Sequence, residues 1–178
     1  MKKILIPLFL FGTGFMMYMM AQTSALLKTP ATPAGIINLE LASDTAKTNA
    51  ILLAWAPNAD SDRIHVAKIN TYWDLLFLFF YAGLLYLLCS LVADNSTGKA
   101  AKIGYLIANA AIVAGIADVM ENTGMLFSLN GLISPIVSFC TAFFSVIKWS
   151  LVTIAILYAI GGLLVLAYRK IRSNSISI

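Results

Sequence analysis

Charged residues are scarce in this chain. Asp, Glu, Lys and Arg together make up 11% of its 178 residues, whereas an ordinary soluble domain carries about 25%. Hydrophobic residues make up 60% and the mean hydropathy is +0.87. This composition excludes a soluble globular domain and indicates an integral membrane protein. The length is that of one domain, so residues 1–178 are predicted to form a single membrane domain.

Cysteine and histidine are nearly absent. Cys89 and Cys140 fall near opposite ends of their apolar segments, which argues against a disulfide. The only histidine, His65, cannot complete a usual zinc or haem site alone, and we expect it to be exposed; a ligand or proton-relay role is the alternative. There is no CxxC pair, phosphate-binding loop or zinc motif, so we expect no cofactor and no metal.

Four long apolar runs are present instead, and about 20 residues suffice to cross a bilayer. The predicted spans are residues 4–21, 72–93, 103–121 and 146–168. The first could be a cleaved signal peptide, but its length and the lack of a clean cleavage site favour a retained helix. The apolar run of the last span begins as early as residue 135, so that helix either over-fills the membrane or follows a non-spanning segment. The expected fold class is an all-α, integral membrane four-helix bundle.

The positive residues predict the orientation. With the N-terminus inside, seven cations lie in the cytoplasm on short segments: Lys2, Lys3, Lys99, Lys102, Arg169, Lys170 and Arg172. The other loop cations lie on a long outer segment, mixed with acids: Lys28, Lys47, Arg63 and Lys68. The positive-inside rule therefore predicts that both termini are cytoplasmic and that residues 22–71 are extracytoplasmic. Because the net charge of +4 flanks apolar segments, no nucleic-acid partner is expected.

The long outer segment is predicted to form a helical cap, residues 30–68, with two short interfacial helices at 33–43 and 44–56. Thr32 and Pro33 suggest an N-cap followed by proline at the first helical position. Ser43 or Asp44 is expected to cap the second helix, which residues 56–58 (APN) would end. Asp60 or Ser61 is expected to begin a helix that continues into the second span.

The cap has two interpretations, a structural lid or a gate over a ligand site. Glu40 favours the gate because it is the only acid within an otherwise apolar helix. Trp55, Tyr72 and Trp73 are expected at the water–lipid boundary, where an aromatic ring with one polar atom is most stable.

Ionisable residues within the spans are expected to have a structural or functional role, because a charge in hydrocarbon costs several kcal/mol unless it is paired or solvated. Asp74, Asp118, Glu121 and Lys148 are all predicted near the outer ends of their helices, at a similar depth under the cap. Asp118, Glu121 and Asn122 share one helix face, since they stand at i, i+3 and i+4. A pair between Lys148 and either acid on that face would offset most of the cost.

This candidate site has three interpretations. It is a structural clasp between helices, a binding site for a polar headgroup, a cation or a proton, or a set of residues that reach solvent at the helix ends. The surplus of acid favours binding, because three carboxylates and one lysine cannot all be both paired and charged. The candidate residues are Asp118, Glu121, Asn122, Lys148, Asp74 and Glu40.

Several motifs occur together: TPAGIINLELA, LLAW, WDLLFLFFYA and AGIADVMEN. With them the chain resembles uncharacterised bacterial four-helix integral membrane proteins, which have a PxGI…ELA segment after the first span and a DxxEN signature in the third. The resemblance covers most of the chain. Glu40 matches the acid of the first motif, and Asp118, Glu121 and Asn122 match the second. It implies a bacterial inner-membrane location, an architecture and a site, but no activity.

The expected function is therefore coarse. The first hypothesis is a non-enzymatic membrane protein that binds a small polar or amphipathic ligand, a lipid, a partner subunit or a second copy of itself at the Asp118, Glu121 and Lys148 site. The second is an enzyme acting on a lipid or isoprenoid, with carboxylate acid/base chemistry. The third is a proton or cation carrier, which is disfavoured because four helices leave little room for alternating access.

Overall fold

The computed structural model describes residues 2–56 and 62–176, and within these ranges its secondary structure is helical, without a β-strand. The helices are α1 (Lys2–Leu26), α2 (Ile36–Glu40), α3 (Thr45–Ala54), α4 (Arg63–Asp94), α5 (Gly98–Leu129) and α6 (Pro135–Ile176). The all-α prediction is confirmed. Cys89 and Cys140 are both free, as expected.

Four helices, α1, α4, α5 and α6, are long and apolar enough to cross a membrane, which makes this a multi-pass membrane protein. They are longer than the predicted spans, because a helix continues past the point where its sequence turns polar. Both α4 and α5 have 32 residues, and at about 1.5 Å per residue such a helix exceeds a hydrocarbon core of roughly 30 Å. The helix α6 runs unbroken for 42 residues, so no separate segment precedes its span.

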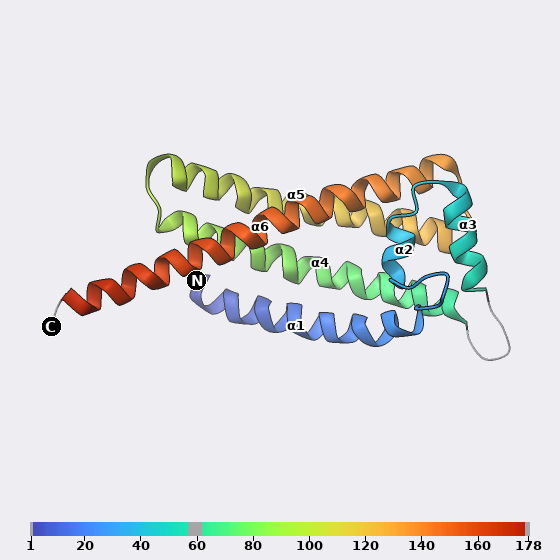
Figure 1. Cartoon of the computed structure of the whole chain (residues 1–178), viewed down its shortest axis with the longest axis horizontal. Helices are drawn as coiled ribbons and strands as arrows, with labels where there is room; N and C mark the ends of the chain where they lie inside the picture. Colours follow the sequence, from blue (N-terminus) through green and yellow to red (C-terminus); the bar gives the residue numbers. More distant parts are fainter. Residues whose placement is uncertain (1, 57–61, 177–178) are drawn as a thin grey trace.

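Three of the long helices form the core of the bundle, and α1 is attached to one side (Figure 1). The helix α5 packs along both α4 and α6, whereas α1 packs chiefly against α4. That contact is reciprocal: Phe80 lies where a side chain on Gly12 would be, and Phe9 lies where one on Gly83 would be. Small residues let two helices approach closely in a membrane, where apolar surface alone gives little driving force for association.

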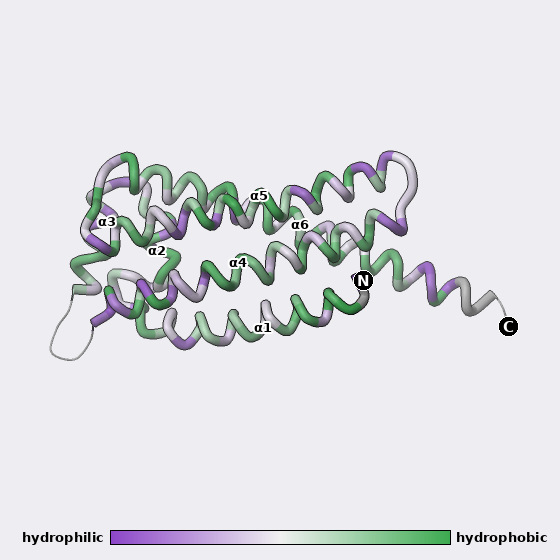
Figure 2. Tube along the Cα trace, turned by 180° about the vertical axis from the view of Figure 1, so that it is seen from behind, coloured by the Kyte–Doolittle hydropathy of each residue, from purple (hydrophilic) through white to green (hydrophobic). Residues whose placement is uncertain are grey.

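The short helices α2 and α3 lie across one end of the bundle, which we call the cap end (Figure 1). Their apolar side chains form one buried cluster with residues of the long helices: Leu27, Ile36, Leu39, Ala42, Ile51, Trp55, Ala67, Met125 and Leu129. The predicted cap therefore packs on the bundle. Hydrophilic residues gather at this end and around the turn between α4 and α5 (Figure 2).

Trp55 is a correction to the sequence analysis. It does not lie at a water–lipid boundary but is fully buried in the cap. Its Nε1 donates to the carbonyl oxygen of Leu27 at 3.0 Å and to Thr32 Oγ1 at 3.1 Å. Burial of the ring and a satisfied N–H together make Trp55 the anchor of the cap. Tyr72 is exposed as expected, and Trp73 is half-buried.

The helix starts are confirmed only in part. Asp44 caps α3, accepting from the backbone N–H of Lys47 at 2.8 Å, and this bond holds the pKa of Asp44 below its usual value. The Thr32–Pro33 start is wrong: α2 begins at Ile36 after Gly35, because the Thr32 hydroxyl is bonded to the Leu27 carbonyl instead.

The boundaries of α3 and α4 also differ from the expected ones. The helix α3 ends at Ala54, slightly before the expected stop, and α4 begins at Arg63 with Asp62 as its N-cap. Asp60 and Ser61, expected at that start, lie outside the described residues, as do Pro57 and Asn58. His65 is exposed, as expected.

Candidate functional site

Polar side chains from four helices meet inside the bundle below the cap. This polar cluster consists of Glu40 (α2), Asp74 and Tyr81 (α4), Asp118, Glu121 and Asn122 (α5), and Lys148 and Trp149 (α6). Its acids, Asn122 and Lys148 are each at most 5% exposed. All six residues selected from the sequence are therefore brought together, and α1 contributes none.

Lys148 lies at the centre of the polar cluster. Its Nζ is 2.8 Å from Glu121 Oε1, 3.4 Å from Asp118 Oδ1 and 3.5 Å from Glu40 Oε2. The expected pairing of Lys148 with the acids of the third span is thus confirmed. Glu40 supplies a third contact, which connects the cap to α6.

The remaining acid, Asp74, is held through an amide. Asn122 Nδ2 donates to Asp74 Oδ2 at 3.0 Å and to Asp118 Oδ1 at 2.9 Å. Tyr81 donates its hydroxyl hydrogen to Asp118 Oδ2 at 2.7 Å. Asp118 therefore accepts hydrogen bonds from an amide, a phenol and an ammonium.

Two members of the polar cluster were missed in the sequence. Tyr81 stands seven residues after Asp74, two helical turns along the same face of α4, and that spacing was a usable signal. Trp149 donates from Nε1 to Glu40 Oε2 at 3.2 Å, and the Lys148 ammonium lies 5.3 Å from the centre of its ring. No spacing in the sequence points to Trp149, because its partner belongs to the cap.

The hydrogen-bond donors of the polar cluster are all engaged. An ammonium has three N–H groups, a primary amide two, and a phenol and an indole one each. Lys148 donates two hydrogen bonds and makes an ion-pair contact with Glu40, Asn122 donates two, and Tyr81 and Trp149 donate one each. Yet Glu121 Oε2 and Asn122 Oδ1 are buried without a partner among the described residues. With its carboxyl groups ionised, the cluster thus has more acceptors than donors.

The charges show the same imbalance. Four carboxyl groups, from Glu40, Asp74, Asp118 and Glu121, surround the single ammonium of Lys148. If all were ionised, four negative charges and one positive charge would leave −3 in a nearly dry interior. An unpaired buried ion costs several kcal/mol, so some of these carboxyl groups carry protons or are balanced by an added cation.

The polarity of the buried side chains on α6 changes at the polar cluster. Towards the cap, α6 buries small polar side chains, and Ser138 Oγ lies 2.9 Å from Thr48 Oγ1 of α3. Ser145, one turn before Lys148, is fully buried, and its Oγ has no partner among the described residues. Away from the cap the interior is apolar, formed mainly by Tyr81, Ala82, Leu85, Cys89, Ala108, Ala111, Ala155 and Ala159. Along α6, the cluster therefore separates buried small polar side chains from the apolar interior.

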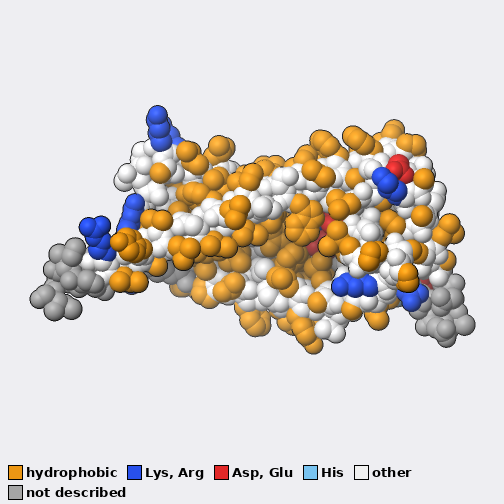
Figure 3. All heavy atoms as spheres, viewed as in Figure 1, with side chains coloured by type: hydrophobic (Ala, Val, Ile, Leu, Met, Phe, Trp, Pro, Cys, Tyr) orange, Lys and Arg blue, Asp and Glu red, His pale blue; other side chains and the backbone are white. Residues whose placement is uncertain are grey.

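The polar cluster is closest to the surface between α4 and α6. These two helices contact each other less than either contacts α5, and they diverge towards the cap end (Figure 1). Figure 3 shows acidic side-chain atoms on this face, recessed among hydrophobic ones. Glu40 and Asp74 are each 5% exposed, whereas Glu121 and Asn122, on α5 behind them, are fully buried. Acidic atoms of the cluster are therefore visible from this face.

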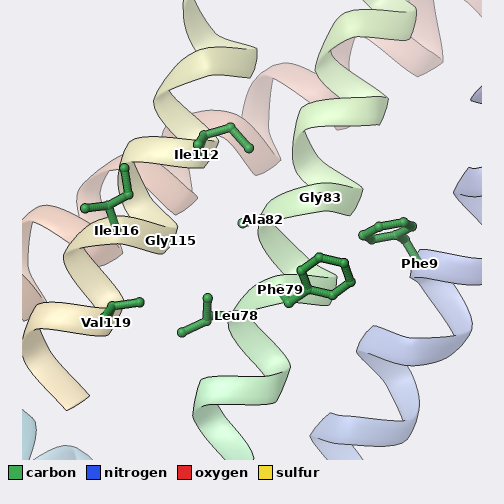
Figure 4. Close-up of a pocket in the computed structure, with 9 residues that line it drawn as sticks. All are labelled: Phe9, Leu78, Phe79, Ala82, Gly83, Ile112, Gly115, Ile116 and Val119. Carbon is green, nitrogen blue, oxygen red and sulfur yellow. The ribbon is translucent and has the colours of Figure 1, made fainter. Parts of the chain in front are cut away.

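A separate groove of about 300 Å³ lies between α1, α4 and α5 (Figure 4). Its lining is apolar: Phe9, Leu78, Phe79, Ala82, Gly83, Ile112, Gly115, Ile116 and Val119. A side chain on Gly115 would lie 3.2 Å from the Ala82 methyl, so the two helices are in close contact at its floor. The groove is apolar and has none of the chemistry of the polar cluster.

Metal binding has no geometric support: across residues 2–56 and 62–176, no three His, Cys, Asp or Glu side chains are placed to hold an ion. Comparison with protein-family models, with curated proteins and with solved structures finds no match to this chain.

Proposed function

We propose that this chain is a small bacterial inner-membrane protein that binds a small polar or amphipathic ligand at the polar cluster. In this proposal both termini are cytoplasmic and the cap end faces outward. The distribution of Lys and Arg supports that orientation, since Lys99 and Lys102 lie in the first two turns of α5, directly after the short connection from α4.

The observation that carries the proposal is the excess of buried acceptors. A clasp that only fixes helix packing is served best by matched partners, because every unmatched buried group costs stability. Here four acids surround one lysine, and Glu121 Oε2 and Asn122 Oδ1 have no donor within the described chain. A ligand with hydrogen-bond donors would satisfy both atoms.

The acid surplus also favours a second function, proton binding. An empty site must hold protons on some of its carboxyl groups, and these would be released when a positively charged ligand enters. Such a site would act as a proton carrier if water reached it from both sides of the membrane. An enzyme acting on a lipid or isoprenoid would use the same carboxyl groups as acid and base.

Native mass spectrometry of the purified protein tests the proposal. We expect the natural protein to retain a small molecule and Glu121→Gln to lose it, because glutamine removes the charge and converts the unpartnered acceptor into a donor. Asp94→Asn is the matched control, an exposed acid at the far end of α4. A natural protein without any bound molecule, or equal retention by Glu121→Gln, would contradict ligand binding at the cluster.

A further inference from the structure

We infer that the ligand is a membrane-borne primary amine, whose ammonium group enters the polar cluster sideways between α4 and α6. This inference rests on the proposed function and adds the chemical class of the ligand and its route. The shared chemistry is an alkylammonium on an apolar chain, as in an aminolipid headgroup or a long-chain amine.

The charges and unpaired acceptors of the polar cluster favour one chemical class of ligand. A phosphate or carboxylate ligand would be repelled by the four acids, with Lys148 already engaged by three of them. A hydroxyl-bearing ligand brings donors but leaves the negative charge in place. A quaternary ammonium brings charge but no N–H group for Glu121 Oε2 or Asn122 Oδ1. A primary ammonium supplies both one positive charge and three donors.

Lys148 shows how the polar cluster holds such a group. Its ammonium contacts three carboxylates and lies 5.3 Å from the centre of the Trp149 ring, the combination of acids and an aromatic face that suits an organic cation. One alkylammonium is thus already bound, as part of the chain. Since four acids exceed the charge of Lys148, a second ammonium can be balanced beside it.

The exposed fractions of the side chains on α6 indicate the route by which the ligand enters. Trp149 is 47% exposed, while its Nε1 is bonded to Glu40 inside. Val146, one turn earlier on the same face of α6, is 57% exposed and apolar. At the cap end, Leu39 and Trp55 are buried in the apolar cluster of the cap, which disfavours entry of an ammonium group there. A ligand therefore reaches the cluster from the bilayer, with its chain along the α6 face that carries Val146 and Trp149.

Three probes against the natural protein test the class and the source together. Dodecylamine has the chain, the charge and the N–H groups. Dodecyltrimethylammonium keeps the chain and the charge but has methyl groups in place of the N–H groups, and ethanolamine keeps the charge and the N–H groups but has a hydroxyl in place of the long chain. Binding is measured by titration of the protein in lipid nanodiscs. We expect dodecylamine to bind at least about tenfold more tightly than the quaternary probe, since a hydrogen bond to a charged group is worth this much. Ethanolamine should show no saturable binding.

A pair of variants on α4 then locates the site. Asp74→Asn keeps the size of the side chain but removes one negative charge, and we expect it to weaken dodecylamine binding about tenfold. Asp94→Asn makes the same change at the exposed end of the helix and should bind as the natural protein does. The comparison of probes in the natural protein does not depend on either variant folding.

The outcomes separate the inference from the proposed function. Equal binding of the quaternary probe would overturn the amine class, and saturable binding of ethanolamine would overturn the membrane-borne source. If Asp74→Asn weakens the binding of the quaternary probe or of ethanolamine, the polar cluster remains a ligand site. Binding of dodecylamine that Asp74→Asn leaves unchanged would overturn the location, and absence of binding by all three probes would overturn the inference. Retention of another molecule, lost in Glu121→Gln, would then still support the proposed function.

Discussion

Lys148 is the residue on which the polar cluster depends. It is the only cation among the members of the cluster, and it contacts acids from the cap and from α5. Removing one partner of a buried ion pair leaves an uncompensated charge, which costs about 3–5 kcal/mol, whereas removing both partners costs far less. The lysine therefore has a structural role whether or not a ligand binds beside it.

Lys148→Met should accordingly lower the free energy of unfolding by about 3–5 kcal/mol, and Lys148→Met with Glu121→Gln should recover much of that loss. Thermal unfolding in detergent measures both, with the exposed Lys99→Met as control. A double variant as unstable as the single one would contradict the pairing. Because the cluster is also a ligand site in our account, the double variant should regain stability without regaining the retained molecule.

Tyr81 gives a second test at this scale. Tyr81→Phe removes only the hydroxyl that donates to Asp118 Oδ2, and we expect a loss of about 1–3 kcal/mol because a buried acceptor is left without its donor. Tyr86→Phe, an exposed position on the same helix, should change stability little. The same unfolding measurement compares the two, and equal effects would mean that the Tyr81 bond contributes nothing.

At the scale of the elements, the cap is the part whose position matters. The helix α2 has only five residues, and its place is set by Gly35 before it and by Glu40 at its end. Gly35 has φ +63, a conformation that L residues rarely adopt, and a side chain there would lie 3.1 Å from the Ser24 carbonyl oxygen. The turn into α2 therefore depends on glycine, and through α2 the turn positions Glu40.

Gly35→Ala should loosen the cap, because a backbone with φ 63 and ψ −129 costs of order 1–3 kcal/mol for a residue with a side chain. Hydrogen exchange of residues 36–54 should become faster, with α4 and α5 unaffected. Gly14→Ala is the control, since Gly14 lies in α1 with open space around it. Unchanged exchange in Gly35→Ala would show that the turn does not fix the cap.

Some features of these elements were predictable from the sequence and others were not. The four spans and the Asp44 cap were predictable, because apolar length and capping residues are local properties. The Lys148 pairing was predictable because an unpaired charge within a span is costly and Lys148 is the one cation in the predicted spans. Burial of Trp55 and the bond from Trp149 to Glu40 were not, because both depend on how the cap packs on the bundle, which no local pattern indicates. The start of α2 was misplaced for the same reason: Thr32 bonds to Leu27 and Trp55 rather than to its own helix.

For the whole molecule, the orientation in the membrane decides which leaflet supplies a ligand. Cysteines introduced at Ser96 and Ser175, in a background without Cys89 and Cys140, should react with an impermeant reagent only after the membrane is permeabilised. A cysteine at Asn49, exposed on α3, should react in intact spheroplasts. Labelling of Ser96 or Ser175 positions in intact spheroplasts would reverse the orientation and place the polar cluster in the inner leaflet.

A crystal structure of the protein grown from lipid, without added amine, distinguishes a ligand site at the polar cluster from a closed clasp. Our account predicts non-protein density between α4 and α6, with a polar end within hydrogen-bond distance of Glu121 Oε2 and Asn122 Oδ1. A cluster in which protein groups alone satisfy these two atoms, with no density beside Trp149, would contradict it.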